Sequence, residues 1–301
     1  MRIGFIGLGN MGGGMAASLV RAGHAVAAFD LVADAVARAV GTGCVPARSA
    51  AAAVADVDAV VTMLPAGRHV AAAYRDEIMA GAASGALLID CSTIDVATAR
   101  AVAADAGAAG FDMVDAPVSG GIAAAAAGTL TFMVGGTADA FGRAAPILAA
   151  MGTTAIHAGP AGAGQAAKIC NNLLLGASMV ATAEAFVLAQ KLGLDAQTFF
   201  DISSRASGQC WSMTSYCPVP GPVPAAPSNR DFTGGFAAAL MLKDLKLAVE
   251  AAQSVGASVP MGAQAAALYQ MFAGLGGEAK DFSAIIKLLD GGWTGTAGAA
   301  S

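Results

Sequence analysis

Charged side chains are scarce in this chain of 301 residues. Lys, Arg, Asp and Glu make up 12% of it, which is roughly half of the usual share. The net charge is −5, the pI is about 5.1, and no basic cluster occurs. A nucleic-acid-binding protein needs such a cluster, so the composition argues against a nucleic-acid partner. With so few charges to cover the surface, we also expect burial between subunits of a homo-oligomer.

Cysteine and histidine are rare as well. The five cysteines form no Cys-x-x-Cys pair, and none has a histidine at metal-ligand spacing. We therefore expect no metal, no disulfide and a reducing, cytoplasmic location. The N-terminus does not resemble a signal peptide. No membrane span is predicted either, because the apolar run 169–183 meets Glu184 before it reaches the roughly 18–20 residues that a span needs.

The start of the chain carries a dinucleotide-binding pattern. A short apolar strand, Arg2–Ile6, leads directly into Gly7-Leu8-Gly9-Asn10-Met11-Gly12, after which apolar residues recur with a helical period. In this strand–turn–helix context, the glycines permit a tight turn, close approach to a pyrophosphate and close helix packing. The helix N-terminus then faces the phosphates.

An acidic residue follows at the distance that such a site requires. A second strand, His24–Phe29, ends at Asp30. A carboxylate about 20 residues beyond the glycines can bond both ribose hydroxyls of NAD. The same carboxylate would repel the 2′-phosphate of NADP, so the sequence predicts NAD. Phe29 and Asp30 are both included in the predicted cofactor site.

Further strands alternate with helical segments. We predict them at 59–63, 86–90, 111–115, 129–135 and 154–157. In an open parallel sheet, ligands bind beyond the carboxyl ends of the strands. The expected ligand-facing tips are therefore Met63-Leu64-Pro65, Cys91-Ser92-Thr93 and 116–121. Within the last tip, Ser119-Gly120-Gly121 is either a plain turn or a loop that holds a small carboxylate.

The second half has long helical patterns, at 166–192, 195–205, 241–255 and 262–273. We predict an α/β protein: an N-terminal Rossmann-type doubly wound sheet (1–162), an all-α domain for substrate binding and dimerisation (163–292), and a tail (293–301). A loop at 206–236 carries five prolines, and loops of this length are usually functional. Its Trp211 either lines a substrate pocket or anchors the loop in the core.

Oxidation of an alcohol by a nicotinamide cofactor needs a base for the hydroxyl proton. The three histidines, His24, His69 and His157, all fall in the sheet-forming half, and His69 is better placed for the cofactor than for the substrate. No tyrosine is followed by a lysine four residues later. Elimination leaves Lys168, which lies where a glycine-rich turn runs into a long apolar helix near the predicted domain junction.

Simpler explanations of the lysines stay open at this point. A lysine near a helix start is most often a solvated charge. Lys243 and Lys246 share one helical face. That face is either a solvated stripe or, at Lys243, a cation that helps Lys168 to act as a base. Asn172 lies one turn from Lys168 on the same face.

Four motifs resemble those of the β-hydroxyacid dehydrogenases, and together they span most of the chain. They are Gly4–Gly12, Asp115–Gly121, Gly162–Asn172 and Leu242–Leu245. The proline-rich loop is most similar to that of the members that act on 3-hydroxyisobutyrate. The resemblance implies NAD-dependent oxidation of (S)-3-hydroxyisobutyrate to methylmalonate semialdehyde in valine catabolism, by a cytoplasmic homodimer or homotetramer without a membrane partner.

The resemblance also implies roles for individual residues. Lys168 is the general acid/base, Asn172 assists it, and Ser119, Gly120 and Gly121 hold the substrate carboxylate. Further cofactor contacts are implied at Leu64, Pro65, His69, Thr93, Phe236 and Lys243. The chain departs from the family at Ser18, where asparagine is common, and in the Ala123–Ala127 run. We expect Ser18 to loosen the packing of the first helix.

Other functions are compatible with parts of this pattern. The nearest is a semialdehyde or glyoxylate reductase of the same superfamily. A non-catalytic NAD-binding module is a second alternative, but a scaffold does not need a lysine at the junction. An imine reductase is a third, and such enzymes typically lack this lysine.

Overall fold

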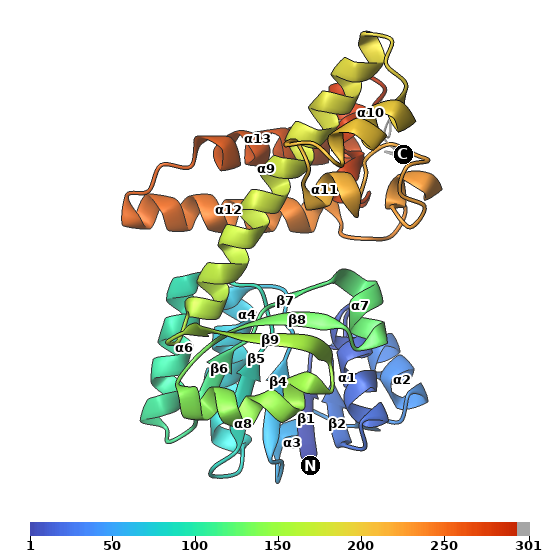
Figure 1. Ribbon diagram of the computed structural model, residues 1–301. Helices are drawn as coiled ribbons and strands as arrows, with labels where there is room; N and C mark the ends of the chain where they lie inside the picture. Colours follow the sequence, from blue (N-terminus) through green and yellow to red (C-terminus); the bar gives the residue numbers. More distant parts are fainter. Residues whose placement is uncertain (294–301) are drawn as a thin grey trace, which may run out of the picture. The chain divides into compact units, whose positions relative to one another are not determined.

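The computed structural model describes residues 1–293, which form two compact units (Figure 1). The first unit is Met1–Lys168 and the second begins at Ile169. This division lies a few residues beyond the predicted boundary at 162. The helix α9 (Ala163–Lys191) begins in the first unit and continues into the second.

The first unit contains one sheet of nine strands in the order β3-β2-β1-β4-β5-β6-β8-β7, with β9 paired to β8. Strands β1 to β6 are parallel, whereas β8 is antiparallel to both β6 and β7. The sheet is therefore mixed and not wholly parallel as predicted. Its strands are β1 (Arg2–Ile6), β2 (Ala25–Phe29), β3 (Val45–Pro46), β4 (Ala59–Thr62), β5 (Leu87–Asp90), β6 (Met113–Asp115), β7 (Val118–Ser119), β8 (Leu130–Gly135) and β9 (Gly152–Gly159).

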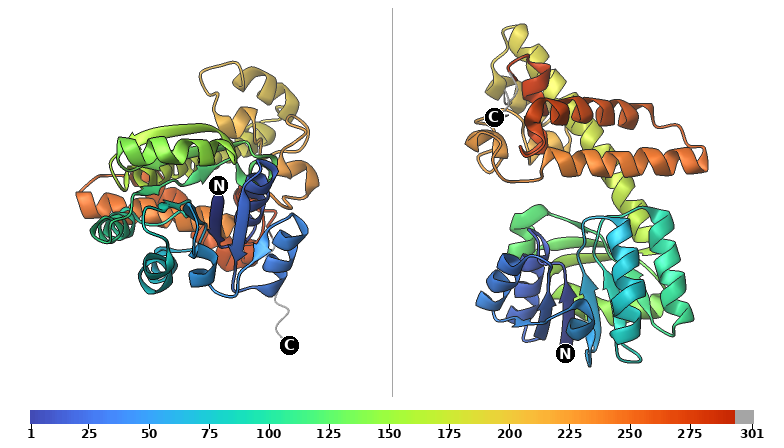
Figure 2. Two further views of the ribbon diagram at one scale, coloured as in Figure 1. Left: turned by 90° about the horizontal axis from the view of Figure 1, so that it is seen from below. Right: turned by 180° about the vertical axis from the view of Figure 1, so that it is seen from behind.

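Helices cover both faces of this sheet (Figures 1 and 2). Alternate strand residues point to opposite faces: Phe5 packs with α1, α2 and α8, and Ile6 packs with α3, α4 and α6. This burial on both faces explains why the parallel strands are continuous apolar runs. The helices of this unit are α1 (Gly12–Arg21), α2 (Ala33–Gly41), α3 (Ala50–Val54), α4 (Gly67–Ala73), η1 (Tyr74–Ile78), α5 (Met79–Gly81), α6 (Val96–Ala108), α7 (Gly121–Ala127) and α8 (Ala138–Ala149).

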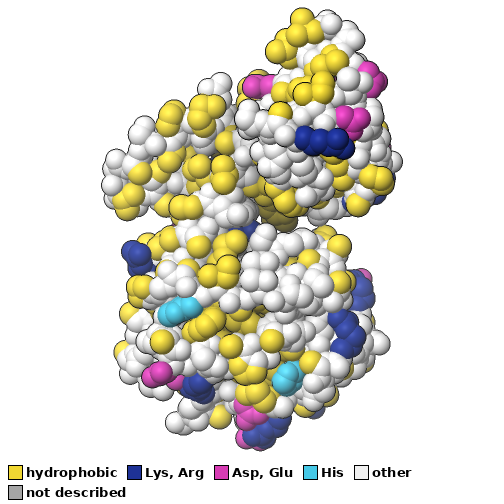
Figure 3. Space-filling model, viewed as in Figure 1, with side chains coloured by type: hydrophobic (Ala, Val, Ile, Leu, Met, Phe, Trp, Pro, Cys, Tyr) yellow, Lys and Arg dark blue, Asp and Glu magenta, His cyan; other side chains and the backbone are white. Residues whose placement is uncertain are grey.

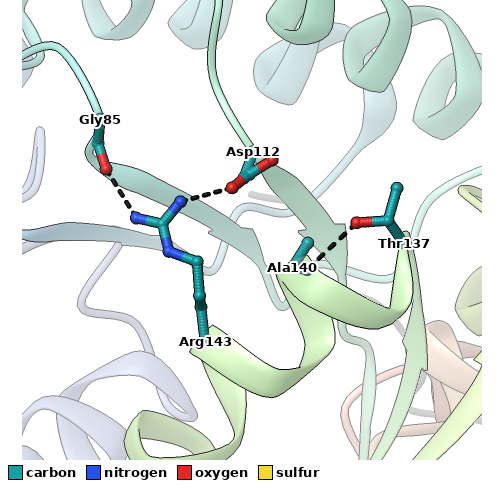
Figure 4. A network of polar contacts seen from close by, with 5 residues as sticks. All are labelled: Gly85, Asp112, Thr137, Ala140 and Arg143. Carbon is teal, nitrogen blue, oxygen red and sulfur yellow. Dashed lines mark hydrogen bonds and ion pairs between the residues drawn. The ribbon is translucent and has the colours of Figure 1, made fainter.

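The amino ends of β5 and β6 are fastened by a polar network that Figure 4 shows. Arg143 of α8 donates hydrogen bonds to the carboxylate of Asp112 and, at 2.6 Å, to the carbonyl oxygen of Gly85. Thr137 accepts a hydrogen bond from the Ala140 amide and caps α8. These contacts hold the sheet edge opposite to the one where ligands bind in folds of this type.

The second unit is helical, as predicted. Its core is formed by α9, α12, α13, the C-terminal turn and helix at 282–289, and the folded 206–236 segment. Its elements are α9 (Ala163–Lys191), α10 (Ala196–Ser203), α11 (Trp211–Thr214), η2 (Pro227–Arg230), α12 (Ala238–Val255), α13 (Pro260–Phe272), η3 (Ala273–Gly277), η4 (Phe282–Ala284) and α14 (Ile285–Leu289).

Two sequence predictions need correction here, and two elements were not predicted. The 206–236 segment is not simply a loop, because it contains α11 and η2. The strand β7 and the helix α7 were not predicted at all. Trp293 is no frayed residue: its ring packs edge-on against Phe272 and its indole N–H donates to the Leu275 carbonyl. The rest of the predicted tail, 294–301, lies outside the described residues.

The membrane prediction also needs correction. Among residues 1–293, α9 is long and apolar enough to cross a membrane by length and composition, and 50% of the qualifying window is buried within the protein. A core helix passes the same test. The uncharged run at 169–183 underestimates the length of the helix, because α9 begins earlier, at Ala163.

The scarcity of charge is visible on the surface. On the face drawn in Figure 3, Lys, Arg, Asp and Glu side chains lie singly or in small groups among apolar and small residues. In the second unit, several large apolar side chains on α9, α12 and α13 are exposed. They are Leu174, Leu188, Leu240, Val255, Met261 and Met271.

Candidate active site

The glycine-rich turn between β1 and α1 has the shape that a pyrophosphate requires. A Cβ atom on Gly12 would lie 1.9 Å from the Gly7 carbonyl oxygen, so only glycine permits this closeness of helix and turn. A Cβ atom on Gly9 would meet no atom within 4 Å, because this part of the turn is open. The first turn of α1 therefore offers its backbone amides next to open space, and a dinucleotide phosphate fits there.

Asp30 holds this turn in place. One carboxylate oxygen accepts a hydrogen bond from the Leu8 amide at 2.6 Å, and the other accepts one from the Val32 amide at 2.8 Å. Each oxygen keeps lone pairs for further donors. Asp30 thus connects the end of β2 to the turn that contains Asn10 and Met11, and Phe29 precedes it at the end of the strand.

The tips of β4 and β5 are joined by hydrogen bonds that the sequence did not predict. The Leu64 amide donates to the Ser92 hydroxyl at 2.8 Å, and that hydroxyl donates to Asp90 at 2.6 Å. Thr62 also donates to Asp90, at 2.7 Å. The predicted cofactor residues Met63, Leu64 and Pro65 on one tip and Thr93 on the other are therefore connected through Asp90 and Ser92.

Asp90 is fully buried, and this burial raises its pKa from 3.8 to about 6. Hydrogen bonds from Ser92 and Thr62 oppose the rise. The sequence placed Ser92 in a predicted ligand-facing tip and Thr62 in a predicted strand, but it did not indicate that both bond Asp90. His69, in α4 beyond the β4 tip, is half-buried, and its Nδ1 atom is buried without a hydrogen-bond partner. An orphaned polar atom of this kind fits a site that receives a ligand.

The predicted carboxylate loop lies at the start of α7. Ser119 ends β7, Gly120 has φ 133° and precedes the helix, and Gly121 begins it. Ser18 of α1 lies against this helix and is 2% exposed. Its hydroxyl lies 3.2 Å from the Ala125 carbonyl oxygen and 3.0 Å from that of Gly14. The expected loosening of α1 at Ser18 is therefore wrong, because Ser18 ties α1 to α7.

The start of α9 is anchored to the carboxyl edge of the sheet. Asp115, at the end of β6, accepts hydrogen bonds from the Gly162 amide at 2.7 Å and from the Gln165 amide at 2.9 Å. Burial raises the pKa of Asp115, and these amides oppose the rise. Lys168 follows one turn later and is 7% exposed. A solvated lysine is thereby excluded.

In the second unit, Asn172 and Lys243 meet at a buried carboxylate. The Asn172 amide donates to Asp244 at 2.5 Å, and the Lys243 ammonium lies 3.4 Å from the other oxygen of Asp244. Asn172 and Asp244 are almost fully buried. Lys246 instead bonds Gln270 on the surface. The two lysines are thus not one solvated stripe, since Lys243 is paired with a buried acid.

A second cluster in this unit organises Trp211 and Phe236. Trp211 is 50% exposed and stacks on Tyr216 with ring centroids 4.9 Å apart. Tyr216 donates to Asp281 at 2.7 Å, and Asp281 also accepts from the Phe236 amide at 2.7 Å. Trp211 is therefore not a core anchor. Sequence reasoning missed Asp281, because its partners are distant along the chain.

The structure thus brings the predicted residues together in three places. In the first unit they lie along the carboxyl edge of the parallel strands, from the glycine-rich turn to Lys168. In the second unit they form the Asn172–Asp244–Lys243 group and the Trp211–Tyr216–Asp281–Phe236 group. All five cysteines are free. Among residues 1–293 no group of three or more His, Cys, Asp or Glu could hold a metal ion.

A strand order of 3-2-1-4-5-6, an open glycine turn at a helix N-terminus and an acid at the end of β2 define a nicotinamide-dinucleotide-binding fold. In this chain the fold is followed by a helical unit. Comparison with known proteins is in accord. Residues 2–159 match the NAD binding domain of 6-phosphogluconate dehydrogenase, and residues 162–289 match the family described as NAD-binding of NADP-dependent 3-hydroxyisobutyrate dehydrogenase.

Individual relatives cover nearly the whole chain. A 3-hydroxyisobutyrate dehydrogenase of Pseudomonas aeruginosa is 49% identical over 96% of this chain and 98% of its own, and an NAD-dependent L-serine dehydrogenase of that species is 50% identical over the same shares. The solved structure of Mycobacterium tuberculosis 3-hydroxyisobutyrate dehydrogenase with L-serine has a TM-score of 0.92 at 51% identity, covering 96% and 98%. The chain belongs to the 3-hydroxyisobutyrate dehydrogenase family, and it is a dehydrogenase of hydroxy acids that uses a nicotinamide dinucleotide.

Proposed function

We propose that this enzyme oxidises (S)-3-hydroxyisobutyrate to methylmalonate semialdehyde with NAD, as a step of valine breakdown. The observation that carries the proposal is Lys168, a lysine 7% exposed on a helix whose start is anchored beside the dinucleotide-binding tips. Relatives named for this reaction at 42–51% identity support it.

Lys168 acts as the general acid/base. A dinucleotide held by the Gly7–Gly12 turn and Asp30 would supply the hydride acceptor for the hydroxyl-bearing carbon of the substrate. The Lys168 amine takes the hydroxyl proton in this direction and returns it in the reverse direction. Asn172, one turn further along α9, assists with an amide whose orientation Asp244 and Asn171 hold.

The remaining predicted residues bind the substrate or the cofactor. Ser119, Gly120 and Gly121 hold the substrate carboxylate with backbone and hydroxyl donors, and Trp211 covers the apolar part of the substrate. Asp30 selects NAD, because its carboxylate accepts ribose hydroxyls and repels a 2′-phosphate. Phe236 and Lys243 are the further cofactor-binding residues of this proposal.

L-serine is a second candidate substrate. One relative at 50% identity is named an NAD-dependent L-serine dehydrogenase, and one solved relative holds L-serine. L-serine has the carboxylate and the β-hydroxyl of 3-hydroxyisobutyrate but an ammonium group in place of the methyl group. The same Lys168 chemistry serves both.

The setting of the enzyme is part of the proposal. Exposed apolar side chains on α9, α12 and α13 support a homodimer or homotetramer assembled through the helical unit. Free cysteines support a reducing compartment, and we propose the cytoplasm. Light scattering of the purified enzyme tests the assembly, and a monomer would contradict it.

Steady-state kinetics with the purified enzyme tests the reaction. We measure kcat/KM for (S)-3-hydroxyisobutyrate, L-serine, D-glycerate, 4-hydroxybutyrate and glycolate, each with NAD and with NADP. We expect (S)-3-hydroxyisobutyrate with NAD to exceed every other pair by about tenfold or more. A higher value for L-serine would establish the second candidate, and a preference for NADP would contradict the role of Asp30.

A further inference from the structure

The side chain of Gln165 is completely buried in the first turn of α9. It has no role in the reaction proposed above, yet it lies between two parts of the first unit that do. One part is the β5 tip with Thr93, and the other is the helix turn that leads to Lys168. Burying an amide is costly unless each of its polar atoms is bonded, so its contacts show what it holds.

Both ends of the Gln165 amide bond the backbone of the β5 tip. Its Nε2 donates to the Ser92 carbonyl oxygen at 2.7 Å, and its Oε1 accepts from the Ile94 amide at 3.1 Å. The two bonds bracket Thr93. A donor and an acceptor are needed at these two places, and a primary amide supplies both.

The backbone of the same residue is bonded on the other side. The Gln165 amide nitrogen donates to Asp115 at 2.9 Å. A Cβ atom on the preceding Gly164 would lie 2.4 Å from the Met133 carbonyl oxygen, so the helix start touches strand backbone and has no room to shift sideways. Its rotation about its own axis is then opposed by the Gln165 side chain.

That rotation decides where Lys168 points. Lys168 is three residues beyond Gln165, about one turn along a helix. A small rotation of the first turn displaces the lysine amine, and a misplacement of about 1 Å can cost about 100-fold in rate. Ser92 extends the connection, because its hydroxyl accepts from the Leu64 amide and donates to the buried Asp90.

We propose that Gln165 is the positioning residue that holds Lys168 in register with the cofactor-binding tips Leu64 and Thr93. The proposal rests on the role of Lys168 given above. Gln165 touches neither substrate nor cofactor. It acts by fixing the helix turn that carries the base to the loop that carries the cofactor.

The test compares Gln165→Leu and Gln165→Glu with the wild-type enzyme. Gln165→Leu keeps the bulk and removes both hydrogen bonds. We expect its kcat to fall about 30- to 100-fold, while the Kd for NAD, measured by calorimetry, changes less than about threefold. The matched control is Gln190→Leu, an exposed glutamine near the other end of α9, which should leave kcat unchanged.

Gln165→Glu separates positioning from packing. A protonated carboxyl can donate to Ser92 and accept from Ile94, whereas an ionised one cannot donate. The neighbouring Asp115, and Asp90 behind Ser92, favour the protonated form of the introduced carboxyl. We therefore expect the ratio of variant to wild-type kcat to rise as the pH falls for Gln165→Glu and to stay flat for Gln165→Leu.

The outcomes are distinct. A Gln165→Leu enzyme within twofold of wild-type kcat overturns the inference, as does a Gln165→Glu ratio that does not change with pH. If Gln165→Leu does not fold, the Gln165→Glu ratio decides alone. A Lys168→Met enzyme made in parallel separates the two proposals: if it keeps turnover, the assignment of the base fails; if it is inactive while Gln165→Leu is normal, only the present inference fails.

Discussion

Asp90 of the first unit and Asp281 of the second bond side chains at different distances along the chain. In the first unit, Asp90 bonds Ser92, two residues away, and Thr62, its partner on the adjacent strand β4 and 28 residues away. In the second unit, Asp281 bonds Tyr216 and Phe236, which precede it by 65 and 45 residues. Both carboxylates are buried, and burial raises the pKa of both.

The two sites obtain their geometry in different ways. Parallel strands place their carboxyl ends along one edge, so short turns suffice to bring ligand-binding residues together. A helical unit has no such edge. There, the carboxylate of Asp281 accepts hydrogen bonds from both parts of a long, proline-rich segment, the Tyr216 hydroxyl and the Phe236 amide. Trp211 stacks on Tyr216.

The largest expected effect comes from removing the proposed base of the first unit. Lys168→Met should lower kcat about 1,000-fold or more, because no other group takes the proton, with NAD binding nearly unchanged. Lys243→Met, in the second unit, should mainly raise KM. Lys191→Met, an exposed lysine at the end of α9, is the control. Stopped-flow measurement of hydride transfer distinguishes these, and a Lys168→Met enzyme with near-normal transfer would refute the assignment.

Removing Asp281, the buried acid of the second unit, should have the next largest effect. Asp281→Ala leaves the Tyr216 hydroxyl and the amides of Phe236 and Ser283 without their acceptor. We expect a loss of about 3 kcal/mol in the free energy of unfolding. Chemical denaturation and Trp fluorescence measure it. Asp201→Ala, an exposed acid bonded only to Gln197 among the described contacts, should cost little, and equal losses would contradict a special role for Asp281.

The raised pKa of Asp90, in the first unit, predicts that the free energy of unfolding depends on pH. The pKa of Asp90 is about 6 in the folded protein and near 3.8 when unfolded. The stabilisation by its proton is therefore fully present below about pH 4 and is lost as the pH rises through about 6, in total about 3 kcal/mol. The measurement is unfolding of wild type and Asp90→Asn across this range.

The stability of wild type relative to Asp90→Asn should fall with rising pH. Asp281, which also has a raised pKa, is present in both proteins and cancels in the difference. Repulsion by Asp115 is one cause of the raised pKa of Asp90, so the difference includes this coupling. Asp105→Asn, an exposed acid on α6, gives the baseline. Two parallel profiles would show that Asp90 does not titrate in this window.

The smallest expected effect concerns Ser18. Ser18→Ala removes the hydroxyl that lies between α1 and α7 and accepts from Arg21 at 2.7 Å. We expect a loss of about 1 kcal/mol in the free energy of unfolding. Ser254→Ala is its counterpart in the second unit, where an exposed hydroxyl bonds the Ala251 carbonyl; it should be near zero. A larger loss at Ser254 would reverse the comparison.

The parts of the site that could be predicted share a short-range cause. The Gly7–Gly12 turn, Asp30 and the strand tips follow from spacing along one strand–turn–helix unit, and the structure places them on one edge. Lys168 emerged by elimination among few candidate bases. The contacts of Asp90, Ser92 and Gln165 were missed, although Ser92 lay in a predicted tip, because a buried polar side chain has no periodic signature. Its role depends on which atoms it meets.

The sequence alone determined the sheet with its two-sided apolar strands, the dinucleotide turn and the helical second half, because these depend on local spacing and on the alternation of apolar residues. Tertiary structure decided that Lys168 is buried, that Ser18 joins two helices, and that Asp281 gathers residues 45 and 65 positions away. Hydrogen bonds between distant segments depend on the position of each donor to a fraction of an ångström, and no pattern along the chain records that distance.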